Sequence, residues 1–522
     1  MSLSRRMDTW FVRLYRMRVP EMLILCISLG LYFLNAFRYK FPLGYAGLYT
    51  LMAERLASNN FGLPMSVPYY GPGGIPFAYP PVAFYIAAIF IKIGLPIFDY
   101  LRFAPPAFTI CSLIAIYILI LRLTSSRIKA IIGATLTAAA SFTYDLHVPA
   151  AGMVRAPALL FGVLGLILAW ETFSPQVRPR KTVVLAILAA AFLGLTAMTH
   201  LSYSAFSVLG IIAFALCSGR RPWRQRLVLC VAILAGGMVL SAPWWGTILS
   251  RFGFALFLNA LQSHSNLGIL SAIRQDGWRT PYGILKDLFS FNNDWEPVQL
   301  VGLEMVGMAY LLLRRRWLVP VWFLGIYLLV GESARFLAIL SCIAAAEALG
   351  DLLSFAYSQE DPRRGGNLIF YPLFAALVFV VCFRDTWRDV NASKPILSDQ
   401  MLAMTDWIRT QTPPDASYLY LGGNGDSVEW LPYLASRSPA VGGWGAEWTG
   451  KFDAQVLLGD QLGTCLAQQS FSCYQMVIQA NGISASYLVS LPAWATLNES
   501  ILADPNWQVT FQNDQFIVFG RK

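Results

Sequence analysis

Two carboxylates and two arginines stand where long apolar runs of this chain meet polar loops. Asp145 and Glu54 are carboxylates that could take a proton from an acceptor, as a general base does. Arg155 and Arg335 could hold a phosphate group through the two-pronged fork of a guanidinium. Either carboxylate could instead be a solvated charge or a salt-bridge partner, and either arginine an interfacial anchor.

Histidine is scarce, since the chain has only three: His147, His200 and His264. Neutral imidazoles bind zinc and other divalent ions, so a metal site is one interpretation, and chance placement of so few residues is the other. His200 could also donate a hydrogen bond to a phosphate.

No phosphate-binding loop, dinucleotide fingerprint or nucleophile elbow occurs, so no other cofactor is indicated.

Aromatic and acidic residues gather near the C-terminus, in Glu429-Trp430 and in Trp444 to Trp448. Such side chains can stack on sugar faces and bind hydroxyl groups. A hydrophobic seam against the membrane domain explains the tryptophans equally well. Trp245 follows another tryptophan at the end of an apolar run, which is typical of a membrane interface. Glu347 lies within an apolar run and needs a partner, so we expect a structural ion pair there.

The composition is that of a polytopic α-helical membrane protein. Of 522 residues, 56% are hydrophobic and 13% are charged, against roughly 25% in a soluble chain. The net charge of +10 does not indicate nucleic acid binding, because Lys and Arg occur in short bursts between apolar runs. Eleven runs are candidate spans: 20–36, 104–121, 130–144, 156–170, 182–198, 203–217, 227–246, 299–313, 317–331, 336–353 and 368–383.

Basic residues predict the orientation of these spans, because they accumulate in cytoplasmic loops. If the further run 80–97 does not cross the membrane, the clusters of Lys and Arg between the spans all fall on one side of the membrane, together with the N-terminus. The segment 80–97 is therefore expected to lie along the outer interface or to re-enter. We predict a cell-membrane protein with a cytoplasmic N-terminus. It has a transmembrane domain over 1–383, with outer loops 37–103 and 247–298, and an extracytoplasmic domain over 384–522.

Residues 384–522 alternate helix and strand patterns, which predicts an α/β domain. Helices are expected at 396–411 and 452–469, strands at 418–421 and 474–478, and a hairpin over 508–519 around Asn513-Asp514. Cys465 and Cys473 could form a disulfide outside the cytoplasm or remain two buried thiols.

The order of motifs resembles the GT-C superfamily of membrane glycosyltransferases, especially the family 39 group with protein O-mannosyltransferases and aminoarabinose transferases. The matching motifs are Tyr49 and Ala53 in a loop helix, Tyr-Pro-Pro at 79–81, Leu-Arg-Phe at 101–103, Thr-His-Leu at 199–201, Pro-Trp-Trp at 243–245 and Ala-Arg-Phe at 334–336. The resemblance implies transfer of a sugar from a polyprenyl-phosphate carrier to an acceptor at the extracytoplasmic face. It implies substrate-binding roles for Tyr49, Trp245, Arg155, His200 and Arg335.

One departure from the family pattern bears on catalysis. Family members place an Asp four residues before the loop tyrosine, where this chain has Tyr45 followed by Ala46. The general base would then be Asp145 or Glu54. The alternative is a non-catalytic accessory or scaffold subunit that works with other membrane proteins. A transporter or flippase is disfavoured, because the two halves lack paired broken helices.

Overall fold

The computed structural model describes residues 18–263, 298–330, 334–358 and 383–522, apart from positions 72, 176, 220, 385 and 424. The chain divides into two compact units. Unit 1 comprises Met1–Arg38, Phe103–Trp244 and Asn266–Ser393, and unit 2 comprises Tyr39–Arg102, Trp245–Ser265 and Lys394–Lys522. The first outer loop therefore shares a unit with the C-terminal segment, whereas the sequence grouped it with the membrane helices.

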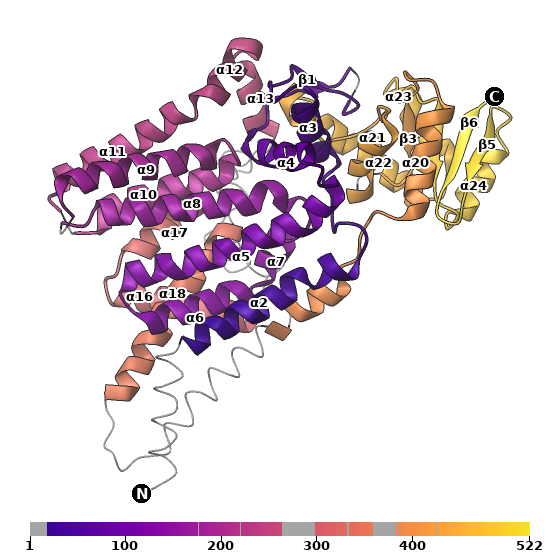
Figure 1. The fold of residues 1–522 in the computed structure, drawn as a ribbon. Coiled ribbons are helices and arrows are strands. Elements are labelled where there is room, and N and C mark those ends of the chain that lie inside the picture. Colours follow the sequence, from indigo (N-terminus) through magenta and orange to yellow (C-terminus); the bar gives the residue numbers. More distant parts are fainter. Residues whose placement is uncertain are drawn as a thin grey trace, which may run out of the picture. The chain divides into compact units, whose positions relative to one another are not determined.

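Unit 1 is built from helices that pack along one another. Helix α8 packs on α9 and α10, α9 on α11, α10 on α17, and α18 on α6 and α16 (Figure 1). The helices are α2 (Val19–Arg38), α5 (Ile97–Thr124), α6 (Arg127–Ala139), α7 (Ser141–His147), α8 (Gly152–Thr172), α9 (Pro179–Ala197), α10 (Leu201–Cys217), α11 (Trp223–Leu240), α16 (Val298–Leu313), α17 (Leu318–Leu329) and α18 (Ala334–Ser358).

Six helices in the described part of the chain are long and apolar enough to cross a membrane: α2, α5, α8, α9, α11 and the Ala334–Ser354 part of α18. Helices α10 and α17 are apolar but shorter. The run 368–383 falls almost entirely outside the described residues. Helix α4 (Val82–Lys92), in the segment 80–97, has 11 residues and a length of about 17 Å, roughly half of the hydrocarbon thickness.

The run 130–144, predicted as one span, is interrupted. Helix α6 ends at Ala139, Ala140 takes an extended backbone with ψ 126°, and the short helix α7 follows. The last carbonyl groups of a helix lack partners within it, so a buried break needs outside donors. Three hydroxyl groups donate to the carbonyls of residues 137 to 139, at 2.7, 2.6 and 2.5 Å: those of Thr143, Tyr32 and Thr386. The interruption directs α7 and its polar residues to one end of the bundle.

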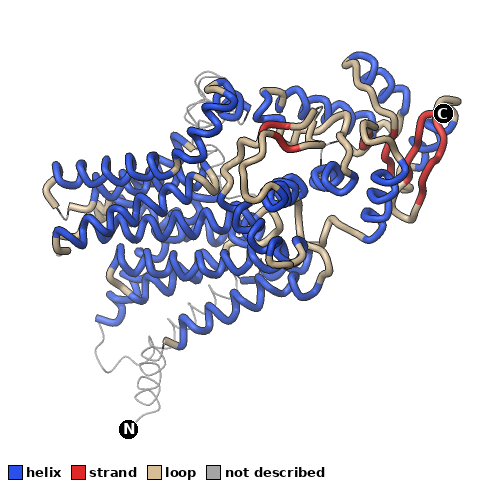
Figure 2. The backbone as a smooth tube through the Cα atoms, turned by 45° about the horizontal axis from the view of Figure 1, so that its top comes forward, coloured by secondary structure: helices blue, strands red, loops and turns tan. Residues whose placement is uncertain are grey.

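Unit 2 contains every strand of the described chain (Figure 2). Strands β3 (Tyr418–Tyr420), β4 (Tyr487–Ser490), β5 (Trp507–Gln512) and β6 (Ile517–Arg521) form a sheet in the order β3-β4-β6-β5, in which only β3 and β4 are parallel. A small pair, β1 (Ser66–Val67) and β2 (Ile75–Pro76), lies in the first loop. The helices are α3 (Gly47–Ser58), α4, α12 (Ala242–Phe252), α13 (Ala255–Ser263), α20 (Asp399–Gln411), α21 (Asp426–Ala435), η1 (Ala446–Thr449), α22 (Phe452–Ala467), α23 (Phe471–Ala480) and α24 (Ala495–Leu502).

Most of the C-terminal prediction is confirmed. Helix α20 begins after Ser398, whose hydroxyl accepts from the Met401 N–H at 3.1 Å, and α22 and β3 occupy the predicted ranges. The hairpin pairs β5 with β6. Its turn is held by Asn513, whose side-chain oxygen accepts from the N–H groups of Gln515 and Phe516 at 3.0 and 2.8 Å.

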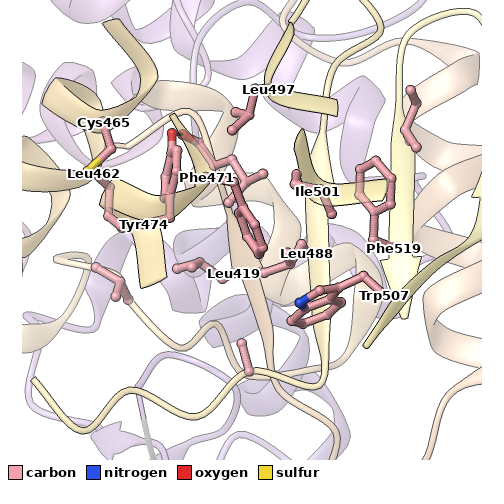
Figure 3. Packing of buried hydrophobic residues seen from close by; sticks show 14 residues of the cluster. Leu419, Leu462, Cys465, Phe471, Tyr474, Leu488, Leu497, Ile501, Trp507 and Phe519 are labelled. Carbon is pink, nitrogen blue, oxygen red and sulfur yellow. Dashed lines mark hydrogen bonds between the residues drawn. The ribbon is translucent and has the colours of Figure 1, made fainter. Parts of the chain in front are cut away.

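The strand predicted at 474–478 is wrong, because this segment is the helix α23. The Ser470 hydroxyl caps the helix by accepting from the Cys473 N–H at 3.3 Å. Cys473 forms a disulfide with Cys465 of α22, which settles the alternative left open by the sequence. Phe471 and Tyr474 then point into the core with Leu419, Leu488 and Phe519 of the sheet (Figure 3). The second strand of the C-terminal segment is β4 instead, which pairs with β3 and β6.

Candidate functional site

Five polar side chains come together where four helices of unit 1 begin or end. We call His147, Arg155, His200, Tyr203 and Arg335 the basic cluster. His147 ends α7, Arg155 lies in the first turn of α8, and Arg335 is the second residue of α18. His200 precedes α10 and Tyr203 lies in its first turn. Arg155, His200 and Arg335, chosen from the sequence, are thus brought into one place.

Tyr203 is the centre of the basic cluster. Its hydroxyl hydrogen-bonds Nε2 of His147 at 2.7 Å, and the His200 ring lies edge-on to the tyrosine ring with centroids 5.1 Å apart. The Arg335 guanidinium lies beside Tyr203 and 5.6 Å from the ring centre of Phe336, to which Tyr203 also packs. Because Tyr203 is about 1% exposed and Arg335 about 7%, these groups are held in fixed positions.

Local geometry forces His147 into this position. A Cβ on Gly152 would approach the His147 carbonyl oxygen to 2.0 Å, so only glycine lets α8 start so close to the end of α7. The Thr109 hydroxyl of α5 donates to the same carbonyl at 3.2 Å. The backbone is therefore fixed from two sides, and the imidazole projects into the cluster.

The charge of the basic cluster comes from its arginines. Burial, together with the charges of Arg155 and Arg335, lowers the pKa of His147 to about 3. His147 is therefore neutral at physiological pH and can bind through hydrogen bonds without adding charge. Two guanidinium groups around a neutral imidazole and a phenol hydroxyl suit an anion such as a phosphate.

Asp145 lies outside the basic cluster. It is two residues from His147 in α7, and side chains at that spacing do not share a helix face. Although part of its surface is accessible, desolvation by the surrounding protein and the charge of Asp389 raise the pKa of its carboxyl to about 7. A carboxyl group with that pKa is half ionised near neutral pH, which is suitable for a general base.

The other three predicted residues belong to unit 2. Glu54 of α3 accepts a hydrogen bond from the Tyr433 hydroxyl at 2.8 Å, and burial raises the pKa of its carboxyl. Tyr49 packs between the rings of Tyr79 and Phe84, at 6.2 and 5.8 Å. Trp245 is half-buried in α12. Glu54 and Tyr49 thus have their printed neighbours within unit 2.

The described part of the chain offers no group of three His, Cys, Asp or Glu side chains that could hold a metal ion. The imidazole rings of His147 and His200 each contact the ring of Tyr203, with centroids 5.8 and 5.1 Å away. His264 lies outside the described residues. The geometry of the two described histidines thus suits hydrogen bonding around Tyr203.

The aromatic and acidic residues of the C-terminal segment are mostly buried. Glu429, Trp430, Glu447 and Trp448 are between 0 and 7% exposed, which leaves no free face for stacking on a sugar. Glu447 accepts a hydrogen bond from Tyr79 of the first loop, and burial raises the pKa of its carboxyl to about 7. These residues join the C-terminal segment to the first loop within unit 2.

Comparisons with known proteins rest on structure alone. No protein-family model and no curated protein matches the sequence. The oligosaccharyltransferase of Archaeoglobus fulgidus, solved without ligand, is similar with a TM-score of 0.62 at 14% identity, over 98% of this chain and 75% of that one. The oligosaccharyltransferase AglB from the same organism, in complex with an inhibitory peptide and a dolichol-phosphate, gives a TM-score of 0.60 at 13% identity, over the same shares. ArnT of Cupriavidus metallidurans, bound to undecaprenyl phosphate, gives 0.55 at 13%, over 96% and 98%.

The chain has the GT-C fold. Its apolar helices and this GT-C fold make it a membrane protein. The predicted resemblance is thereby confirmed at the level of the fold, and so is the fold class with its strand-containing C-terminal part.

The first loop of this GT-C fold has an unexpected carboxylate. Where family members carry the loop Asp, this chain has Tyr45 and Ala46, just before α3. The two carboxylate oxygens of Glu429 accept from the backbone N–H groups of Gly47 and Leu48, each at 2.6 Å. A carboxylate at a helix N-terminus interacts favourably with the helix dipole. A residue from the C-terminal segment therefore supplies the negative charge at this helix end.

Sequence reasoning missed Tyr203 and the contact of Glu429 with α3. Tyr203 follows His200 by three residues, which is the spacing of neighbours on one helix face, so that signal was present. Glu429 contacts α3 across 382 residues of sequence, and nothing local indicates the pairing.

Proposed function

We propose that this chain transfers a sugar from a polyprenyl-phosphate carrier to an acceptor. The observation that carries the proposal is the basic cluster, in which the buried Arg335 and the half-buried Arg155 lie at the helix ends of a GT-C fold. Two proteins of similar fold were solved with lipid phosphates, one with undecaprenyl phosphate and one with a dolichol-phosphate. The chemistry of the basic cluster suits the same class of ligand.

The basic cluster would bind the carrier phosphate. As the sugar leaves, negative charge grows on the phosphate oxygens, and fixed guanidinium donors stabilise this charge most in the transition state. Arg335 and Arg155 supply the charge, while Tyr203 and His200 supply further hydrogen-bonding groups. Because Arg335 is buried, its charge acts through a medium that screens it less than water does.

Asp145 would be the base that takes the acceptor proton. In an inverting transfer the acceptor attacks the sugar face opposite to the leaving phosphate, so the base and the phosphate-binding groups must be separated by the sugar. Asp145 projects from a different face of α7 than His147 does. Its raised pKa leaves it able to accept a proton near pH 7.

The reaction would take place on the extracytoplasmic side. Two features support this orientation: basic residues concentrate in the loops at the other ends of the helices, and the Cys465–Cys473 disulfide needs an oxidising compartment. Cysteine introduced at the exposed Gln225, at the start of α11, should resist an impermeant thiol reagent in intact cells, while cysteine at the exposed Ser484 should react. The reverse labelling pattern would invert the orientation.

Activity can be tested with the full chain in vesicles that contain undecaprenyl phosphate carrying a radiolabelled hexose, with cell-envelope material as acceptor. The wild type should move label out of the organic phase. Asp145→Asn and Arg335→Ala should not, whereas Arg180→Ala, which alters an exposed arginine at the start of α9, should match the wild type. Equal label transfer by all four proteins would contradict the assigned roles.

A non-catalytic accessory subunit is the second candidate, and the first loop favours it. The acidic motif is replaced by Tyr45-Ala46, and the carboxylates of Glu54 and Glu429 are engaged in hydrogen bonds within unit 2. On this alternative the wild type binds the lipid phosphate but moves no label with any hexose. It would also co-purify with another membrane protein.

A further inference from the structure

A recess opens in unit 1 at the opposite end of its helices from the basic cluster. Arg155 and Trp170 mark the two ends of α8, and 15 residues of helix separate them by about 22 Å. The recess lies at the Trp170 end and has a volume of about 660 Å³, which is within the usual range for sites of small ligands. Residues from the ends of five helices line it.

The floor of the recess is an ion-paired network. Lys129 Nζ lies 3.3 Å from Glu347 and 2.7 Å from Asp351. Arg316 contacts the same two carboxylates at 2.5 and 2.8 Å, and the Tyr310 hydroxyl donates to Asp351 at 2.8 Å. Two cations and two carboxylates neutralise one another here, which confirms the expected structural pairing of Glu347. The network therefore has little charge left for a ligand.

Arg315 adds a cation that this network does not neutralise. It lines the recess, is exposed, and makes no ion pair with the described residues. Its backbone has φ 55°, a left-handed conformation that turns the chain sharply between α16 and α17. Ser218 lines the same recess, and its hydroxyl is buried without a hydrogen-bond partner among the described residues. A buried hydroxyl without a partner is uncommon and indicates a missing one.

The rest of the recess is apolar. Leu216 and Trp317 both line it and are 65% and 52% exposed, so they form a hydrophobic rim. The Arg226 guanidinium donates to the carbonyls of Ala215 and Leu216 at 2.7 and 3.0 Å, which fixes the end of α10 and hence the rim. One uncompensated cation, one hydroxyl without a partner and an apolar rim suit an anionic amphiphile.

We propose that this recess binds the phosphate group of an anionic membrane phospholipid. The Arg315 guanidinium and the Ser218 hydroxyl donate hydrogen bonds to the phosphate oxygens. Leu216 and Trp317 contact the glycerol and the first acyl carbons. The site is separate from the basic cluster and independent of sugar transfer. Its place at the ends of apolar helices puts the headgroup at the depth where a bilayer carries its phosphates.

The test measures lipid retention by the full chain in detergent, using native mass spectrometry. Dioleoylphosphatidylglycerol is titrated against the wild type, Arg315→Gln and Arg314→Gln. Arg314 is the matched control, because it is the adjacent exposed arginine and stacks on the Tyr310 ring, 5.6 Å from its centre, outside the recess. We expect about tenfold weaker retention by Arg315→Gln, since a charge-assisted contact is lost, and no change in Arg314→Gln.

Three further arms complete the test. Ser218→Trp fills the recess and should abolish the same binding step while the melting temperature without lipid stays close to that of the wild type. Dioleoylphosphatidylcholine should be retained much less, since it has no net charge. Equal retention of the anionic lipid by Arg315→Gln and Arg314→Gln would overturn the proposal. So would displacement of the lipid by equimolar glycerol 3-phosphate, which would assign the recess to a free phosphate.

Discussion

The hydroxyl of Tyr433 donates a hydrogen bond to the carboxylate of Glu54 at 2.8 Å, so a residue of α21 holds a residue of the first loop. Of the two carboxylates that the sequence offered as a base, Glu54 has a structural partner in place. Because Glu54 has this partner, variants of Tyr433 and Glu54 can test whether Glu54 or Asp145 is the general base.

Tyr433→Phe removes that hydrogen bond and leaves the partly buried Glu54 carboxylate short of a donor. We expect a loss of about 1–3 kcal/mol in the free energy of unfolding of unit 2, seen as a lower melting temperature of the full chain in detergent.

Glu54→Gln keeps an acceptor for Tyr433 and should retain sugar transfer within about twofold. A large loss of transfer in Glu54→Gln at an unchanged melting temperature would make Glu54 the base instead.

Arg335 should decide the affinity for the carrier phosphate. A charge-assisted fork contributes roughly 1.5–3 kcal/mol, so Arg335→Ala should weaken binding of undecaprenyl phosphate about ten- to hundredfold. Arg335→Lys keeps the charge but loses the fork and should fall between alanine and the wild type. Lipid binding can be followed by the quenching of intrinsic tryptophan fluorescence, with Arg180→Ala as control. If both Arg335 variants bind undecaprenyl phosphate as tightly as the wild type, Arg335 only anchors the chain at the membrane interface.

Sugar transfer should rise with pH and reach half its maximum near pH 7, because only the ionised Asp145 accepts a proton and its pKa is about 7. Asp389→Asn removes the neighbouring charge that helps to raise this pKa, so the midpoint of the pH profile should shift to lower pH. Asp145→Asn should lower the rate about 100- to 10,000-fold above pH 7, with a smaller loss at lower pH, where Asp145 of the wild type is itself protonated. If the midpoint of the pH profile does not shift in Asp389→Asn, ionisation of Asp145 does not determine the pH dependence of sugar transfer.

Glu447 predicts a pH dependence of stability. Its pKa is about 7 in the folded chain against a usual value of 4.5, so between these values the folded state keeps a proton that the unfolded state has lost. The contribution of Glu447 to stability therefore falls as pH rises from about 4.5 to 7 and is constant above 7. Glu447→Gln, which can still accept from Tyr79, should raise the melting temperature at pH 8 and change it little at pH 4. An equal effect at both pH values would mean that Glu447 titrates normally.

Prediction from sequence succeeded where the determinant was local. The hairpin of β5 and β6 followed from Asn513-Asp514 between two β-rich runs, because the turn chemistry lies in neighbouring residues. The predicted strand at 474–478 failed because a cap at Ser470 and a disulfide to another helix favoured α23. Strand-favouring residue types alone reveal neither the helix cap nor the disulfide.

The basic cluster was partly predictable for the same reason. Arg155, His200 and Arg335 were chosen one by one, because each polar residue at the end of an apolar run needs an explanation. Their convergence on Tyr203 depends on the packing of α8, α10 and α18, which no local pattern encodes. The separation of Asp145 from His147 depends on α7, a helix created by the break at Ala140 that the continuous apolar run concealed.

The carboxylate of Glu429 at the start of α3 joins residues that are 382 positions apart. Translation at roughly 5–20 residues per second places that carboxylate on the ribosome some 20 to 80 seconds after α3 has been made. During that interval the first N–H groups of α3 lack their acceptor, and the first loop cannot reach its final form. Biogenesis of this loop is therefore coupled to completion of the chain, so a ribosome that stalls before residue 429 leaves behind a nascent protein whose first loop is unfinished.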